Sequence, residues 1–323
     1  MRIGRARITR AVIALSAIAA TVTGCADDGG EHETAPVPSS PAPTSPDANA
    51  PSITGTTGAP APVLDAICAG ETVVDVARRL PDELNEVSGI VASRTTPGWY
   101  WAVEDSGNRA VLEGFDLAGD AVHEVRVLGV LNVDWEDVAI GPGPDGRDLV
   151  WIADTGDNLG FRPSVSLLRF AEPALDTLEV QPSRVEATFE DGPRDAEALV
   201  VATSGVWLFE KTDTGPSGVY RLDTDARVFR RVGEVDVRPA SITGADLSVD
   251  GRVLALRTNR DLRLFRVDDG DVATAVRETP CVVTSLNEVQ GESVAFDPTG
   301  ERLVTVGERG RQDAPVDVHV IGG

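Results

Sequence analysis

Beyond residue 62 the hydrophobic positions fall in short alternating or continuous runs, separated by Gly, Pro, Asp and Asn. Such runs are typical of β-strands and turns rather than of long helices. One pattern recurs five times: an acidic or small cluster, an apolar strand, a turn, and a second apolar strand ending in a charge. The copies are "EVSGIVAS" with "GWYWAVED", "DWEDVAIG" with "DLVWIAD", "RDAEALVVA" with "GVWLFEK", "ITGADLSVD" with "RVLALRT", and "QGESVAFD" with "RLVTVGE".

The spacing of the copies predicts the architecture. The equivalent positions are separated by 48, 61, 48 and 47 residues when they are taken as Ile90, Val138, Leu199, Leu247 and Val294. A four-stranded propeller blade takes about 40 to 50 residues. We therefore expect an all-β fold, a β-propeller of five blades, closed by a strand from residues 71–80 that completes the last copy. Six blades, with one hidden in the longer second copy, and a β-sandwich are the alternatives.

The first residues predict export and lipidation. Four arginines precede an apolar run over residues 11–20 and the sequence "VTGC", which resembles a bacterial lipobox. We expect a signal peptide over residues 1–24, lipid on Cys25, and an anchor to the outer face of the bacterial membrane, the alternative being a plain cleaved signal. Residues 25–62 are rich in Pro, Ser and Thr and predict a disordered tether. Residues 63–323 then form the propeller domain.

The remaining two cysteines predict a disulfide, and the net charge restricts the kinds of partner that the chain can bind. In an oxidising compartment Cys68 and Cys281 are expected to form a disulfide, with a metal site or free thiols as alternatives. The net charge of −23 becomes −27 without the four signal-peptide arginines. So acidic a surface argues against nucleic acid as a partner and favours cations, although solubility explains much of it.

Charged residues are expected to gather at one mouth of the propeller. The start of each first strand and the end of each second strand emerge on the same face. Two neighbouring rows of first-strand residues contain acids, and alternation of side chains lets only one row face the axis. Lys211 and Arg257 come from the ends of second strands, and Trp135 is the aromatic candidate. The expected mouth residues are Trp135, Glu136, Asp137, Glu197, Lys211, Asp246, Arg257 and Glu292.

Several carboxylates in one mouth need compensation, by a cation, by salt bridges, or by raised pKa values. Oxygen ligands without clustered His or Cys favour Ca²⁺ or Mg²⁺ over zinc. The segment "DTGDN" offers Asp154, Asp157 and Asn158 as candidate metal ligands, and "EDSGN" offers Glu104, Asp105 and Asn108 in the same way. Ordinary turn chemistry is the alternative for both segments.

The ordered motifs "DSGN", "DWED", "DTGDN", "DAEAL", "TGAD" and "QGES" resemble those of secreted and lipoprotein β-propellers of bacteria. More distantly, the domain is similar to phytase-like esterase and calcium-dependent lactonase propellers. The resemblance implies that Glu136, Glu197 and Glu292 occupy axial acidic positions. We expect a ligand or protein partner to bind at this acidic face, with Ca²⁺ as a candidate cofactor. A metal-dependent hydrolase and a structural scaffold of the cell envelope are the alternatives. No G-x-S-x-G, P-loop or H-E-x-x-H motif is present.

Overall fold

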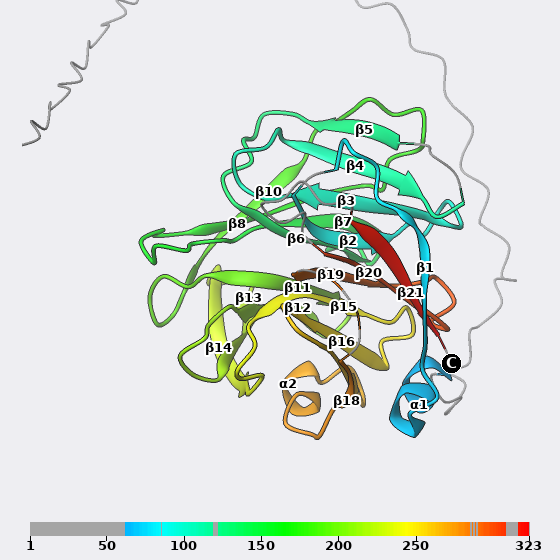
Figure 1. Ribbon diagram of the computed structural model, residues 1–323. Coiled ribbons are helices and arrows are strands. Elements are labelled where there is room, and N and C mark those ends of the chain that lie inside the picture. The colour runs from blue at the N-terminus through cyan, green and yellow to red at the C-terminus, as the bar shows by residue number, and fades with distance from the viewer. Residues whose placement is uncertain are drawn as a thin grey trace, which may run out of the picture. The chain divides into compact units, whose positions relative to one another are not determined.

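The structure is a computed structural model that describes residues 62–84, 86–118, 122–284, 286, 288, 290–307 and 316–322. The expected signal peptide, the lipidation site Cys25 and the tether up to residue 61 lie outside these residues. The described part is all-β, as predicted, with two short helices, α1 (Pro62–Ala69) and α2 (Val272–Ala275) (Figure 1). Neither helix has the length and apolar character needed to cross a membrane.

The strands form five antiparallel meanders. The first contains β2 (Val87–Ala92), β3 (Trp99–Glu104), β4 (Val111–Asp116) and β5 (Val122–Val127). The second contains β6 (Trp135–Pro142), β7 (Asp148–Asp154), β8 (Val165–Phe170) and β10 (Ser183–Phe189). The third contains β11 (Ala196–Ala202), β12 (Gly205–Glu210), β13 (Ser217–Asp223) and β14 (Val228–Val235).

The fourth meander contains β15 (Ile242–Leu247), β16 (Val253–Thr258), β17 (Leu262–Arg266) and β18 (Cys281–Val283). The fifth contains β19 (Gly291–Phe296), β20 (Leu303–Gly307), β21 (Asp317–Gly322) and β1 (Val73–Arg79). Strand β1 pairs antiparallel with β21, so the expected contribution of residues 71–80 to the last copy is confirmed. Each sequence copy thus supplies the first two strands of one meander.

Two additional pairings involve the outer strands. Strand β10 pairs in parallel with β14, which joins the second and third meanders into one eight-stranded sheet. Its two end strands, β6 and β11, also contact each other, so this sheet is nearly closed. The extra length of the second copy includes β9 (Glu179–Val180), which pairs with β5 of the first meander.

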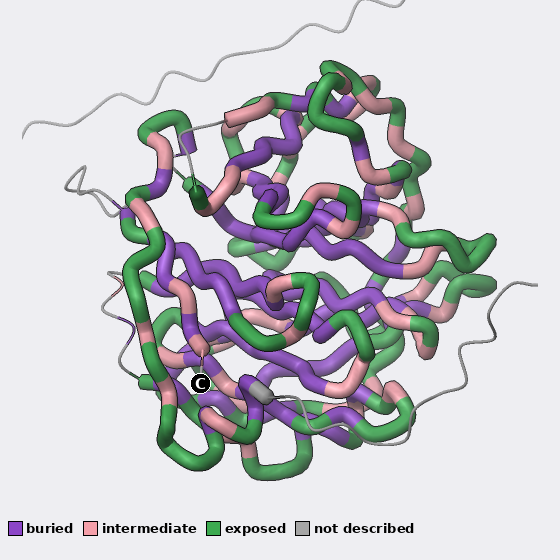
Figure 2. Tube along the Cα trace, turned by 90° about the vertical axis from the view of Figure 1, so that its right-hand side faces the viewer, coloured by how far each residue is buried: buried purple, intermediate pink, exposed green. Residues whose placement is uncertain are grey.

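The first strands of the meanders pack side by side in a cycle, in the order β2, β6, β11, β15, β19 and back to β2. Between consecutive meanders lie five separate hydrophobic clusters. Because both faces of the inner strands are covered, every residue of β2, β15 and β19 is buried, whereas the outer strand β14 mixes buried and exposed positions. Figure 2 shows the buried residues along the strands and the exposed ones in the connecting turns.

Helix α1 packs against the hydrophobic cluster between the fourth and fifth meanders. Pro62 begins the helix, where its missing N–H is not needed. Val63, Leu64 and Ile67 are buried against residues of the fourth and fifth meanders. The next residue, Cys68, forms a disulfide with Cys281 in β18, which confirms the expected pairing. The described part of the chain therefore starts with a helix that precedes β1.

Candidate functional site

A hollow of about 60 Å³ lies where the inner strands begin. It is lined by Glu136, Glu197, Glu292 and Lys211, four of the residues expected there, together with Glu86, Val87, Ser88, Asp105, Asn158 and Gln290. The structure thus brings the repeated acidic residues of the second, third and fifth copies together, although they are far apart in the sequence.

A shift of strand register recurs at the same point of every inner strand. In β6, for example, Trp135 lies opposite Asp154 but Asp137 lies opposite Ala153, so Glu136 is an extra, bulged residue. The bulged residues of the five strands are Ser88, Glu136, Glu197, Thr243 and Glu292. In the first and fourth meanders the bulged hydroxyl donates to a carbonyl of the next inner strand, that of Trp135 and Gly291 respectively. In the other three it is a glutamate that reaches the hollow.

Asp137 serves a different purpose from Glu136, although the two are neighbours in β6. Its carboxylate is fully buried and accepts hydrogen bonds from the N–H groups of Val138 (2.8 Å), Leu199 (2.8 Å) and Ala245 (3.3 Å). It therefore connects three inner strands, β6, β11 and β15. Burial raises the pKa of Asp137 well above its ordinary value, while the three N–H groups lower it.

Asp246 does not lie with the mouth residues. It accepts the N–H groups of Leu247 (2.8 Å) and Phe296 (2.7 Å) and lines a separate hollow that also includes Arg94. The reason is that the equivalent of Ile90 in the fourth copy is Ala245, not Leu247. A shift of two residues preserves the alternation of a strand, so the periodicity alone could not reveal it.

Two further expected mouth residues lie in the interior. Trp135 is fully buried in the cluster between the first and second meanders and contacts no hollow among those described. Arg257 is also buried, and it forms an ion pair with Glu288. Glu288 in turn contacts His319 Nδ1 (3.2 Å) and accepts the hydroxyl of Thr305 (2.7 Å). Both side chains therefore contribute to packing between strands, and the expectation that they line the mouth is wrong.

The two aspartates of the segment "DTGDN" contact residues that follow closely in the chain. Asp154 forms an ion pair with Arg162 (2.7 Å). Asp157 accepts the N–H groups of Phe161 (3.0 Å) and Arg162 (2.8 Å), while Asn158 is exposed and lines the hollow. Neither aspartate belongs to the groups of converging Asp, Glu, His and Cys side chains in the described part of the chain. The hydrogen bonds of Asp157 are those expected of a turn.

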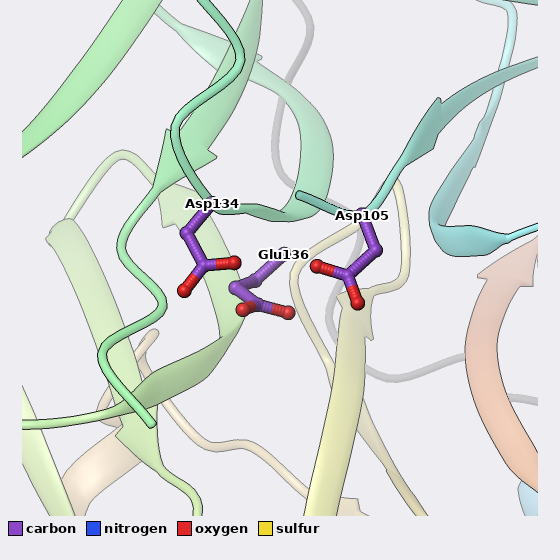
Figure 3. A group of neighbouring side chains, drawn as sticks. All are labelled: Asp105, Asp134 and Glu136. Atoms are coloured by element: carbon purple, nitrogen blue, oxygen red, sulfur yellow. The ribbon is translucent and has the colours of Figure 1, made fainter. Parts of the chain in front are cut away.

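Carboxylates from other segments gather around Glu136 instead. Two sets have potential ligand oxygens within 4.8 Å of one another: Asp105, Asp134 and Glu136, and Glu136, Asp195 and Glu197. Figure 3 shows Asp105 from the loop after β3 and Asp134 from the loop before β6 with Glu136 between them. Glu136 belongs to both groups, which we call the outer triad (Asp105, Asp134, Glu136) and the inner triad (Glu136, Asp195, Glu197).

Burial, and after it mutual repulsion, raises the pKa values of these carboxylates. Burial raises the pKa of Glu136 well above its ordinary value, and the carboxylates around it raise it further. Burial likewise raises the pKa of Asp134 to about 6 and that of Glu197 to about 8, although Lys211 acts against the latter. The carboxylates are therefore poorly compensated by the described residues.

The two triads differ in how far hydrogen bonds and ion pairs from described residues compensate their negative charge. In the inner triad Lys211 Nζ lies 2.6 Å from Glu197 Oε1, and Asp195 accepts the N–H of Asp157 (2.7 Å). By contrast, no described residue donates a hydrogen bond to the carboxylate of Glu136, a residue only 4% exposed. Asp134 Oδ1 is also buried without a donor in the described part. In the outer triad the N–H of Ser106 donates to Asp105, and a hydrogen bond from the Ser106 side chain lowers the pKa of Asp134. No described Lys or Arg forms an ion pair with its three carboxylates, so converging oxygens are combined with uncompensated charge.

Asp134 and Asp195 were not expected in the site, although a sequence signal existed. Both stand two residues before a bulged glutamate, in "DWE" and "DAE". Glu86 and Gln290 occupy the same position in the first and fifth copies, and both line the hollow. A polar residue therefore stands two positions before the bulge in every copy, and it is an acid in the first three.

No protein-family model and no curated protein matches this chain. Among solved structures, "Structure of U3-55K" matches with a TM-score of 0.41 and 12% identity, over 77% of this chain and 98% of that one. A glucose dehydrogenase matches with a TM-score of 0.48 and 10% identity, over 78% of this chain and 99% of that one.

Proposed function

We propose that this chain is a lipid-anchored, five-bladed β-propeller that binds Ca²⁺ at its acidic mouth and, through the ion, a ligand or protein partner. The cyclic contacts of five inner strands and the five clusters between meanders support this blade number. The additional length of the second copy forms β9 and loops in the described part, which argues against a sixth blade. The ordered motifs support a place among secreted bacterial propellers.

Glu136 is the observation that carries the cation proposal. A carboxylate removed from water without a donor or a cation is costly, and it either takes up a proton or binds a positive ion. Glu136 is close to this condition, because it is only 4% exposed, faces a small hollow and has no donor among the described residues. Carboxylate oxygens of Asp105 and Asp134 lie within 4.8 Å of its own. A divalent ion in the outer triad would supply the missing positive charge.

The ligand atoms favour calcium. All the side chains of the two triads are carboxylates, which hard cations prefer, and none is His or Cys. Ca²⁺ accepts six to eight oxygens in irregular geometry, whereas Mg²⁺ demands a near-ideal octahedron and keeps several waters. A site assembled from two loops and a bulged strand suits the more tolerant ion.

Calcium titration of the chelator-treated full chain tests the proposal. We expect binding by calorimetry and a rise of Tm by several degrees at a hundredfold excess over Kd, since binding to the folded state alone then adds about 2.7 kcal/mol. Asp134→Asn should weaken binding at least tenfold. The matched control is Asp176→Asn, an exposed residue remote from the mouth. If chelator and Ca²⁺ leave both Tm and the heat of titration unchanged, the cation proposal fails.

Two further measurements separate the alternatives. Hydrolysis of a phosphoester or lactone by the calcium-loaded protein, abolished by Asp134→Asn, would favour a metal-dependent hydrolase over a binding protein. The anchor is tested by replacing Cys25, the expected lipidation site, with alanine. We expect the variant to be released from membranes, and retention of unlipidated protein on the membrane would contradict the anchor.

A further inference from the structure

A second hollow, of about 620 Å³, lies between the second and third meanders. It is bordered by the end of β6, at Pro142, and the end of β11, at Ala202, and shares no lining residue with the mouth. Six residues of extended strand separate Glu136 from Pro142, so the two hollows are roughly 20 Å apart. Its volume is within the range of about 300 to 1,000 Å³ found for small-molecule sites.

The charge of this hollow is opposite to that of the whole chain. The protein has 52 acidic and 29 basic residues, yet the described residues that line this hollow include three arginines and no acid. The arginines are Arg169, Arg184 and Arg227. None of them forms an ion pair with a carboxylate in the described part of the chain. Positive charge is therefore concentrated here without a partner.

Arg169 is held in a fixed orientation. Its guanidinium lies over the ring of Trp151, 5.1 Å from the centroid, and its Nε donates to Ser183 Oγ (3.2 Å). Its terminal nitrogens have no acceptor among the described residues. A guanidinium with one edge anchored and the other free is preorganised to bind a carboxylate or a phosphate with two hydrogen bonds.

Arg227 reaches the same hollow from the turn between β13 and β14. Its backbone has a φ of 53°, which is uncommon for a residue with a side chain, and its carbonyl accepts the N–H of Thr188 (3.2 Å). Glycine or asparagine would be easier to accommodate there. Keeping arginine in this conformation is consistent with a role for its side chain.

The remaining walls are apolar or neutral. Pro142, Val206 and Leu222 supply apolar surface, and Thr203 and Thr224 supply hydroxyl groups. We propose that this hollow binds a small organic anion whose carboxylate or phosphate meets Arg169 and Arg227 and whose apolar body packs against Val206 and Leu222. The site is independent of the proposed calcium site.

Three probes of matched shape test this assignment on the full chain: phenyl phosphate, benzoate and the neutral benzyl alcohol. We expect at least one anion to bind at least tenfold more tightly than the alcohol in calorimetric titrations. Preference for phenyl phosphate would indicate a phosphorylated ligand, and preference for benzoate a carboxylate. Equal or tighter binding of the alcohol, or no binding of either anion at millimolar concentration, overturns the proposal.

Two arginine variants test whether the anion binds in this hollow. Arg169→Gln and Arg227→Gln should each weaken the preferred anion about tenfold or more, the loss expected for one hydrogen bond to a charged group. Arg227 is exposed and has no described side-chain partner, so its replacement leaves folding intact even if Arg169→Gln does not. The matched control is Arg260→Gln, an exposed arginine outside this hollow. Unchanged affinity in Arg227→Gln and in folded Arg169→Gln overturns the assignment.

Discussion

Glu136 and Asp137 are adjacent buried acids for which the structure predicts opposite effects of the same chemical change. Replacing either by its amide keeps the shape and removes the charge. Glu136 has no hydrogen-bond donor among the described residues, whereas Asp137 accepts three backbone N–H groups. We therefore expect Glu136→Gln to stabilise the metal-free protein and Asp137→Asn to destabilise it.

The magnitudes follow from these contacts. The amide of Asp137→Asn has one acceptor oxygen, so its NH₂ group faces an N–H and leaves up to two buried donors unpaired, each costing about 1–3 kcal/mol. Removal of the buried charge offsets part of this cost, and we expect the free energy of unfolding to fall by roughly 2–4 kcal/mol in total. Glu136→Gln removes repulsion from neighbouring carboxylates, and its new NH₂ can donate to Asp134 Oδ1. A gain of about 1–2 kcal/mol is expected.

Urea unfolding at pH 7.5 with chelator, followed by tryptophan fluorescence and circular dichroism, measures both values. Repeating the series with excess Ca²⁺ adds a second criterion, because calcium should stabilise the wild type and Asp137→Asn but not Glu136→Gln. Equal effects of the two variants in chelator, or a stabilised Asp137→Asn, would refute the assignment of one residue to the mouth and the other to the strands.

Three other predictions concern the buried acid Glu113, the close packing at Gly89 and the disulfide. Burial raises the pKa of Glu113 to about 7, so protonation of this group favours the folded state. The free energy of unfolding should therefore fall by at most roughly 3 kcal/mol as pH rises from about 4.5 to 7. Urea titrations at about pH 5 and 8 measure this fall, which Glu113→Gln should remove. A Cβ on Gly89 would lie 2.6 Å from a backbone atom of β6, so Gly89→Ala should lower the unfolding free energy by about 1–3 kcal/mol, whereas Gly233→Ala, whose closest contact is 3.8 Å, should not lower it. Replacing Cys68 and Cys281 by serine should lower stability by about 2–5 kcal/mol, and an unchanged Tm would show that the bridge does not constrain the unfolded chain.

The sequence predicted the strands and their order because each copy repeats the same apolar pattern with the same turn residues. It could not predict α1, since eight residues show too little periodicity and this helix is fixed by packing and by the disulfide. It also missed the arginine hollow. Arg169 and Arg227 come from different meanders, and neither belongs to a repeated motif. Their convergence depends on the angle between two sheets.

The sequence predicted which glutamates line the mouth, but it did not predict which of the other expected residues are buried. Glutamates at repeated positions predicted Glu136, Glu197 and Glu292 together, because the meander returns each copy to the same face. Burial was not predictable in the same way. Thr258, not Arg257, occupies the strand-end position of the fourth copy, so Arg257 lies one residue earlier and is buried. Trp135 is the first residue of β6 rather than part of a loop, and its side chain is buried as well.

The bulge explains why strict alternation was an inadequate guide. In a regular strand Glu136 and Asp137 would point to opposite faces, and only one could reach the axis. The extra residue rotates the strand locally, so that Glu136 enters the hollow while Asp137 still connects β6 to β11 and β15. The same shift in all five inner strands separates a variable position, which is Ser, Thr or Glu, from the residues that hold the ring together. The bulged residue can therefore differ between copies while the contacts that hold the inner strands together are kept.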